Sequence, residues 1–206
     1  MFVLTFIARS PQADLTALEA RLRASDPLVA FSRTYPDELQ GAYGRAEEAL
    51  EAALLGARFS HFWVGIGVGA LQLPRYAAAL GAVSTPDCSG PALSLSRSAV
   101  EQAQTGAPPR GICLHAAGQL GLEADRLTGL LRLLYRVVAA RTEAEWRVLD
   151  LLLPGVRGQQ RAVAQALGIS AQAVSKTLVR AAWHEELAAR PLAVSLLTTL
   201  DSELYP

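Results

Sequence analysis

The residues best suited to recognise a ligand lie in segment 160–180, where polar side chains recur beside small and aliphatic ones. The amide of Gln172 can pair with adenine through two hydrogen bonds, Lys176 can reach the acceptors of guanine, and Ser175 can contact either base. Nearby arginines suit phosphates, which position a protein on a duplex without reading its sequence. We therefore predict double-stranded DNA as the partner, contacted through Arg157, Arg161, Ser170, Gln172, Ser175, Lys176 and Arg180.

These side chains can act together only if the segment forms two helices joined by a tight turn. Gly168 is suited to the left-handed conformation that ends the first helix, and Ser170 to capping the second. Aliphatic side chains would fill the space between the helices: Val163, Leu167, Ile169, Val174 and Leu178. The pattern predicts a helix-turn-helix that places its second helix in the major groove. A helical hairpin with no nucleic-acid role is the alternative.

The charge distribution favours the nucleic-acid interpretation locally but not for the whole chain. The 206 residues carry 19 basic and 19 acidic side chains, a net charge of zero. Residues 1–122 sum to −1 and residues 123–206 to +1, whereas residues 151–184 contain no acid and carry a net +4. The neutral total argues against indiscriminate coating of DNA and leaves room for a weakly basic module that depends on specific contacts.

The first 120 residues alternate strands and helices. Strands are predicted over 2–8, 28–34, 39–43, 61–69 and 111–116, and helices over 14–25, 45–58 and 94–104. This order predicts an α+β fold with a ferredoxin-like α/β sandwich, its antiparallel or mixed sheet covered by helices on one face. In strand 61–69, Gly65, Gly67 and Gly69 share one side and leave room for a helix or a ligand to approach the backbone.

Strand patterns stop after Gly121, which predicts a front domain over 1–121 and a second domain over 122–206. The second domain would be an all-helical (winged) helix-turn-helix domain. Its first helix, 123–141, has a broad apolar stripe that suits packing on the chain or a dimer interface. Thr142 with Glu145 has the pattern of a capping box. Residues 192–200 fit a helix or a strand, and as a helix they would hold the C-terminus on a neighbouring subunit.

Several short motifs occur in a familiar order along the chain. They are the hairpin Tyr35 to Gly41, the helix Ala46 to Leu55, the strand Trp63 to Gly69, the segment Ser89 to Ala92 and the terminal helix-turn-helix. Over most of its length the chain thus resembles the SatD family of bacterial proteins. The resemblance implies a front domain related to the class III nucleotide cyclase and GGDEF fold, followed by a DNA-binding module.

Cyclases of this kind hold two metals on carboxylates of the first strand and of the hairpin, which bind triphosphate and activate the attacking hydroxyl. Asp37 and Glu38 match the hairpin acids. However, Arg9 ends the segment that stands where the family tends to have Gly-Asp-Ile, and Pro36 replaces the hairpin glycine. We therefore expect no cyclase activity, no catalytic residues, no bound metal and no cofactor.

The same residues define a candidate ligand pocket. Without metals, a small nucleotide-like molecule would be held by Arg9, Arg33, Asp37, Glu38, Gly65 and Gly67. The alternative is that Asp37 and Glu38 are solvated turn acids with an arginine partner.

The composition bounds the class of protein. Hydrophobic residues make up 51% and charged residues 18%, which excludes a disordered chain. No apolar run approaches the roughly 18 residues of a membrane helix, so we expect a cytoplasmic protein that does not contact a membrane. The function predicted is a DNA-binding transcription regulator, expected to be a homodimer, with a non-catalytic sensory or dimerisation domain. The alternatives are a nucleotide-binding protein or cyclase-like enzyme, and a protein–protein interaction module.

Overall fold

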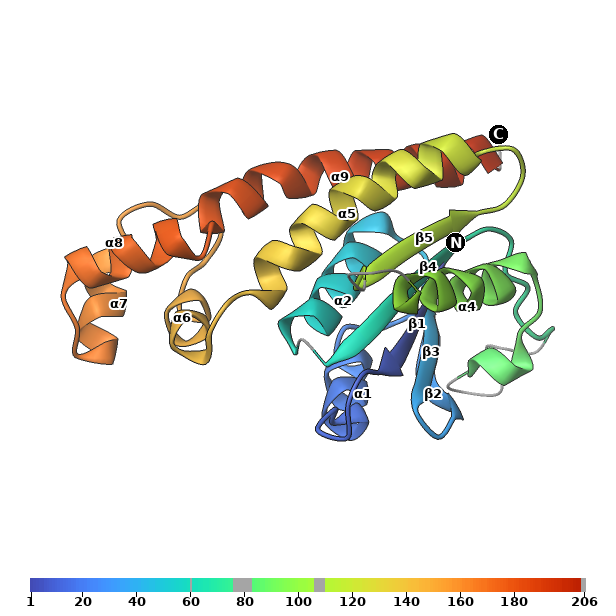
Figure 1. The fold of residues 1–206 in the computed structure, drawn as a ribbon, viewed down its shortest axis with the longest axis horizontal. Helices are drawn as coiled ribbons and strands as arrows, with labels where there is room; N and C mark the ends of the chain where they lie inside the picture. Colours follow the sequence, from blue (N-terminus) through green and yellow to red (C-terminus); the bar gives the residue numbers. More distant parts are fainter. Residues whose placement is uncertain (60, 76–82, 106–109, 205–206) are drawn as a thin grey trace.

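The computed structural model describes residues 1–59, 61–75, 83–105 and 110–204, which form an α+β structure with a five-stranded mixed sheet (Figure 1). The strands are β1 (Phe2–Ala8), β2 (Val29–Tyr35), β3 (Glu38–Tyr43), β4 (Phe62–Val68) and β5 (Ile112–Ala116). The helices are α1 (Leu15–Arg23), α2 (Ala46–Arg58), α4 (Pro91–Gln104), α5 (Gly121–Ala139), α6 (Glu143–Leu149), α7 (Gln160–Leu167), α8 (Ala171–Arg180) and α9 (Trp183–Leu204), with a short 3-10 turn at Thr85–Asp87. Each predicted element of the front half is present, with ends that shift by up to three residues.

The strand order of the sheet is β2-β3-β1-β4-β5. All neighbouring strands are antiparallel except β4 and β5, which are parallel because α4 connects them. β1 lies at the centre, where Thr5 is opposite Gln40 of β3 and Gly65 of β4. The alternation of side chains along β1 therefore divides the molecule into two layers.

Helices cover both faces of the sheet, whereas the sequence predicted helices on one face. Phe2, Leu4 and Phe6 of β1 point into the main core, which also contains buried side chains of α1, α2, α5 and α9. α4 lies on the opposite face, over Gly65 and Gly67 (Figure 1). The glycine stripe of β4 thus accommodates a helix, the first of the two occupants that its sequence allowed.

The helix-turn-helix segment has a core of its own. Buried side chains of α6, α7, α8 and the residues just after α6 and α8 form this second cluster: Val148, Leu149, Leu152, Val163, Ala164, Val174, Leu178 and Ala181. Residues 117–204 contain no strand, so this module is all-helical and the predicted wing is wrong. No helix in the described ranges is both long and apolar enough to span a lipid bilayer.

α5 and α9 run side by side and link the two cores (Figure 1). The buried stripe of α5, including Leu127, Leu131 and Leu134, packs on the sheet of its own chain. Residues 192–200 are helical, because α9 continues through Pro191 and buries Leu197 in the main core. Of the two options that the sequence left open for residues 192–200, the structure has the helix, and this helix packs on its own chain.

Candidate nucleic-acid interface

The turn between α7 and α8 has the predicted geometry. Gly168 adopts φ 65° and ψ 31°, the left-handed conformation that ends α7 without a Cβ clash. The Ser170 hydroxyl caps α8 by accepting a hydrogen bond of 3.1 Å from the backbone N–H of Ala173. Ile169 is 40% exposed, so its predicted role as a filler between the helices is wrong. The cap formed by Ser170 sets where α8 begins, so the structural role of Ser170 precedes any contact with DNA.

α8 has one buried and one exposed side. Val174 and Leu178 are buried against α6 and α7. Gln172, Lys176 and Arg180 are exposed at intervals of four residues, which places them along one side of the helix. Ser175 lies beside them and is partly exposed. The side chains predicted to contact base edges therefore share one accessible surface at the end of the molecule furthest from the sheet (Figure 1).

The basic residues around this surface differ in their availability. Arg157 precedes α7 and Arg161 lies in its first turn, and both are exposed with no acidic partner within 4 Å among the described residues. Arg180 instead contacts Glu145 of α6, with 2.5 Å between its Nε and the carboxylate. Glu145 lies outside the acid-free stretch 151–184 and compensates one of the four positive charges of that stretch. Arg180 therefore fixes α8 against α6 and does not stand free for a phosphate.

Glu145 also completes the predicted capping box of α6. Its carboxylate accepts a 2.8 Å hydrogen bond from the backbone N–H of Thr142, while the Thr142 hydroxyl accepts one from the backbone N–H of Glu145. The Thr142 N–H and, after it, Arg180 hold the pKa of Glu145 below its ordinary value. Folding therefore stabilises the ionised form of the Glu145 side chain.

This lowered pKa predicts a stability contribution that depends on pH. A carboxylate whose pKa is depressed by folding stabilises the protein above its unfolded-state pKa of about 4.3, and the contribution disappears as the pH falls through the folded-state pKa. The difference in unfolding free energy between the wild type and Glu145→Gln, measured with urea, should therefore shrink from pH 6 to pH 3. At pH 6 the exposed control Glu143→Gln should stay within about 0.5 kcal/mol of the wild type. A Glu145→Gln difference that does not change with pH would contradict this assignment.

The structure does not assemble the six residues of the candidate ligand pocket into one site. Arg33 donates a 2.9 Å hydrogen bond to the hydroxyl of Thr16, and Asp37 is exposed in the hairpin turn. Gly65 and Gly67 are covered by the backbone of α4. Arg33 lines a hollow of about 380 Å³ between β2, the 3-10 turn and α4, which Arg9 and Asp37 do not reach.

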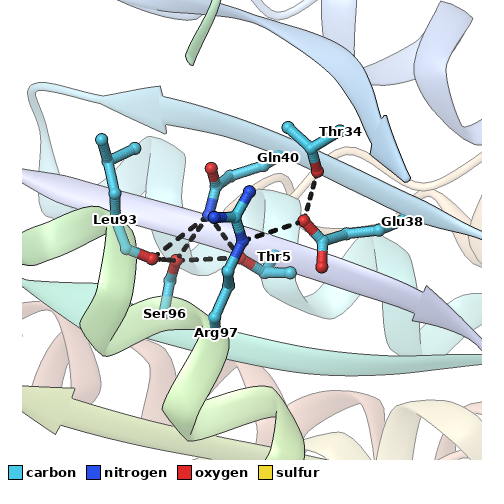
Figure 2. A network of polar contacts seen from close by, with 7 residues as sticks. All are labelled: Thr5, Thr34, Glu38, Gln40, Leu93, Ser96 and Arg97. Carbon is cyan, nitrogen blue, oxygen red and sulfur yellow. Dashed lines mark hydrogen bonds and ion pairs between the residues drawn. The ribbon is translucent and has the colours of Figure 1, made fainter. Parts of the chain in front are cut away.

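Glu38 belongs to a polar network that fastens α4 to the sheet (Figure 2). Its carboxylate accepts hydrogen bonds from Thr34 and, at 3.2 Å, from the Nε of Arg97. Beside it, Gln40 donates to the Thr5 hydroxyl at 3.0 Å and to the Ser96 hydroxyl at 3.1 Å. Thr5, Gln40 and Ser96 are at most 1% exposed, so this inner part of the network is structural and closed to solvent, whereas the Arg97 side chain is 38% exposed.

The hairpin therefore does not suit the metals of a cyclase site. Glu38 is buried and occupied by Arg97 and Thr34, which leaves Asp37 as the accessible hairpin acid. Within the described residues, no three histidine, cysteine or acidic side chains gather where they could hold a metal ion. Arg9 follows β1, the strand that carries a metal-binding acid in the cyclases the sequence resembles, and a cation at this place opposes metal binding.

Arg9 instead belongs to an arginine cluster that the sequence patterns did not reveal. Its guanidinium lies over the ring of Trp63, 4.0 Å from the centroid. Together with Arg110, Arg132 and Arg136 it lines a hollow of about 510 Å³. In the sequence, this cluster could be inferred in part from Arg132 and Arg136, which are four residues apart and therefore share one side of a helix. Only the fold brings Arg9 and Arg110 to the same place.

The two candidate sites lie in different parts of the molecule, one on α8 and one between β1, β5 and α5. The first is an exposed polar side of a helix that follows a tight turn, and the second gathers positive charge in a concave surface. Comparison of the chain with family models, with curated proteins and with solved structures found no match.

Proposed function

We propose that the protein is a DNA-binding transcription regulator whose recognition helix is α8. The observation that carries the proposal is the exposed pair Gln172 and Lys176, with Ser175 beside them, on the side of α8 opposite to its buried anchors. Gln and Lys are side chains that discriminate base edges in the major groove. Arg157, before α7, and Arg161, in its first turn, supply further exposed positive charge to the same module, which suits contacts with duplex phosphates.

We further propose that the front domain is non-catalytic and serves as a sensory or dimerisation unit. The antiparallel order β2-β3-β1-β4 is that of a ferredoxin-like split βαβ unit, with β5 added in parallel at one edge. That order and the helix-turn-helix both support a relationship to the SatD family. A homodimer would suit recognition by one small module, because two half-sites raise the contact area and the specificity.

The test is selection of a binding sequence by the full chain from a library of random duplexes, followed by affinity measurements by fluorescence anisotropy. A common sequence should be enriched, and its affinity should fall steeply with salt because phosphate contacts release counterions. Two inverted copies of the enriched sequence would support a dimer. Absence of any enriched sequence, together with no duplex binding at 50 mM salt, would exclude the proposed function.

Comparing variants of α8 with a double variant of Arg157 and Arg161 should separate contacts with base edges from contacts with phosphates. Gln172→Ala and Lys176→Ala should each weaken binding to the selected duplex by about tenfold to a hundredfold, because a lost base contact costs about 1–3 kcal/mol. Gln172→Ala should also relax the preference at one base pair. The double variant Arg157→Gln/Arg161→Gln should weaken all duplexes alike and reduce the salt slope by about two.

The matched control is Arg126→Gln, which removes an exposed arginine from α5, outside the helix-turn-helix. It should leave both the affinity and the base preference as they are in the wild type. An equal loss in Arg126→Gln and Lys176→Ala would indicate attraction by the overall field of the protein and not by a recognition surface on α8.

A further inference from the structure

We propose that the hollow between β1, β5 and α5 binds a small phosphate-bearing molecule. Four guanidinium groups line it, and they come from separate places in the chain: Arg9 after β1, Arg110 before β5, and Arg132 and Arg136 on α5. The remaining lining residues are Gly111, Leu133, Tyr135, Ala139 and Ala140, none of which is acidic. The site is separate from α8 and shares no residue with the proposed recognition surface.

The charge of this cluster is not balanced within the described part of the chain. None of the ion pairs formed there involves Arg9, Arg110, Arg132 or Arg136. The ranges outside the description contain no Asp or Glu side chain that could balance it. Arginine remains ionised at any physiological pH, so four like charges gather here and repel one another. A ligand with at least two negative charges would relieve that repulsion.

Two of the arginines are held in place by uncharged partners. The Arg132 Nε donates a 3.2 Å hydrogen bond to the carbonyl of Ile112, and its Nη2 lies 2.9 Å from the Cys113 sulfur. Arg9 is stacked on Trp63. These contacts orient the guanidinium groups without neutralising them, and a fixed guanidinium fork matches the geometry of phosphate oxygens. The arrangement therefore resembles a site prepared for an anion.

The shape of the hollow favours a small molecule over the backbone of a duplex. Its volume of about 510 Å³ lies within the range of small-ligand pockets. Arg132 is half-buried beside β5, while Arg9, Arg110 and Arg136 are exposed around it. A small anion inside the hollow would lie beside Arg132 as well as the other three, whereas a duplex on the outer surface would contact mainly the exposed three. Leu133, Ala139 and Ala140 add an apolar wall against which a non-phosphate part of the ligand could pack.

The test is isothermal titration calorimetry of the full chain with pyrophosphate at 50 mM salt, without added metal. Wild type and Arg126→Gln, which changes an exposed arginine of α5 outside the hollow, should bind equally. Arg136→Gln should weaken binding by at least about tenfold, since a hydrogen bond to a charged group contributes about 1.5–3 kcal/mol. The double variant Arg9→Gln/Arg136→Gln should show no saturable heat. Both positions are exposed, so circular dichroism should show wild-type folding.

Titrations with further ligands distinguish a nucleotide from an inorganic phosphate compound as the natural ligand. An adenosine or guanosine diphosphate that binds at least about tenfold tighter than pyrophosphate would support a nucleotide whose base or ribose packs on the apolar wall. Equal affinities would support recognition of the phosphate groups alone. The proposal is overturned if wild type binds none of these probes, or if Arg136→Gln and Arg126→Gln lose the same factor. It is also overturned if duplex DNA displaces pyrophosphate and Arg136→Gln loses duplex affinity equally, which would assign the arginines to DNA.

Discussion

Glu186→Ala should lower the unfolding free energy by about 3–5 kcal/mol, because it leaves a buried guanidinium without its counterion. The Glu186 carboxylate lies 2.8 Å from the Nη2 of Arg141, and the two side chains are 0% and 1% exposed. Arg141 also donates a 3.0 Å hydrogen bond to the carbonyl of Ala181. The pair connects the segment that enters the helix-turn-helix with the helix that leaves it, so its loss should loosen that module first.

Tryptophan fluorescence reports on this place directly, since the Arg141 guanidinium lies 5.0 Å from the centroid of the Trp146 ring and 5.9 Å from that of Trp183. Urea unfolding followed by this signal should show the loss. The matched control Glu185→Ala removes the neighbouring exposed carboxylate and should stay within about 0.5 kcal/mol of the wild type. If the two variants unfold at the same urea concentration, the buried pair does not hold the module in place.

A double variant separates the charge from the packing. Arg141→Met/Glu186→Gln removes both charges of this contact, while Arg190, the second partner of Glu186, keeps its ion pair with Glu51. Replacing a buried ion pair by uncharged side chains of similar size is often close to neutral. We therefore expect the double variant to be more stable than Glu186→Ala alone. If the double variant loses as much stability as Arg141→Met and Glu186→Gln lose together, the two side chains stabilise the fold independently.

The local structure of the chain could be predicted from its sequence because local signals agree with the fold. Gly168, Ser170 and the pair Thr142–Glu145 each set a helix end through contacts within a few residues. The end of α9 could not be predicted in this way. A proline within a segment normally ends a helix, but burial of Leu197 and Leu200 against α5 and α2 carries α9 through Pro191 to Leu204.

The candidate sites also divide into features that follow from local sequence and features that depend on packing between distant segments. The row of Gln172, Lys176 and Arg180 follows from helical spacing alone, so the sequence was sufficient to place it. The pairing of Arg180 with Glu145 and the gathering of Arg9 with Arg136 join positions far apart in the chain. No periodicity within one segment could signal them, because they depend on how α6 meets α8 and how α5 crosses the end of the sheet.

The glycines of β4 lead to the other large expected effect. A Cβ at Gly65 would lie 2.1 Å from the carbonyl oxygen of Ser96 and 2.4 Å from the backbone nitrogen of Val100. Both atoms belong to the backbone of α4, which cannot move without breaking the buried contacts of Thr5 and Gln40 with Ser96. Gly65→Ala should therefore lower the unfolding free energy by at least about 3 kcal/mol, the upper range for overpacking a core.

The control is Gly129→Ala on α5, where a Cβ would meet no atom within 4 Å. Because alanine favours a helix over glycine by about 1 kcal/mol, this variant should be as stable as the wild type or more so. Thermal unfolding followed by circular dichroism compares the two directly. A Gly65→Ala protein within about 1 kcal/mol of the wild type would show that α4 can move away from β4. In that case the glycine face would again be open to a ligand, as its sequence first allowed.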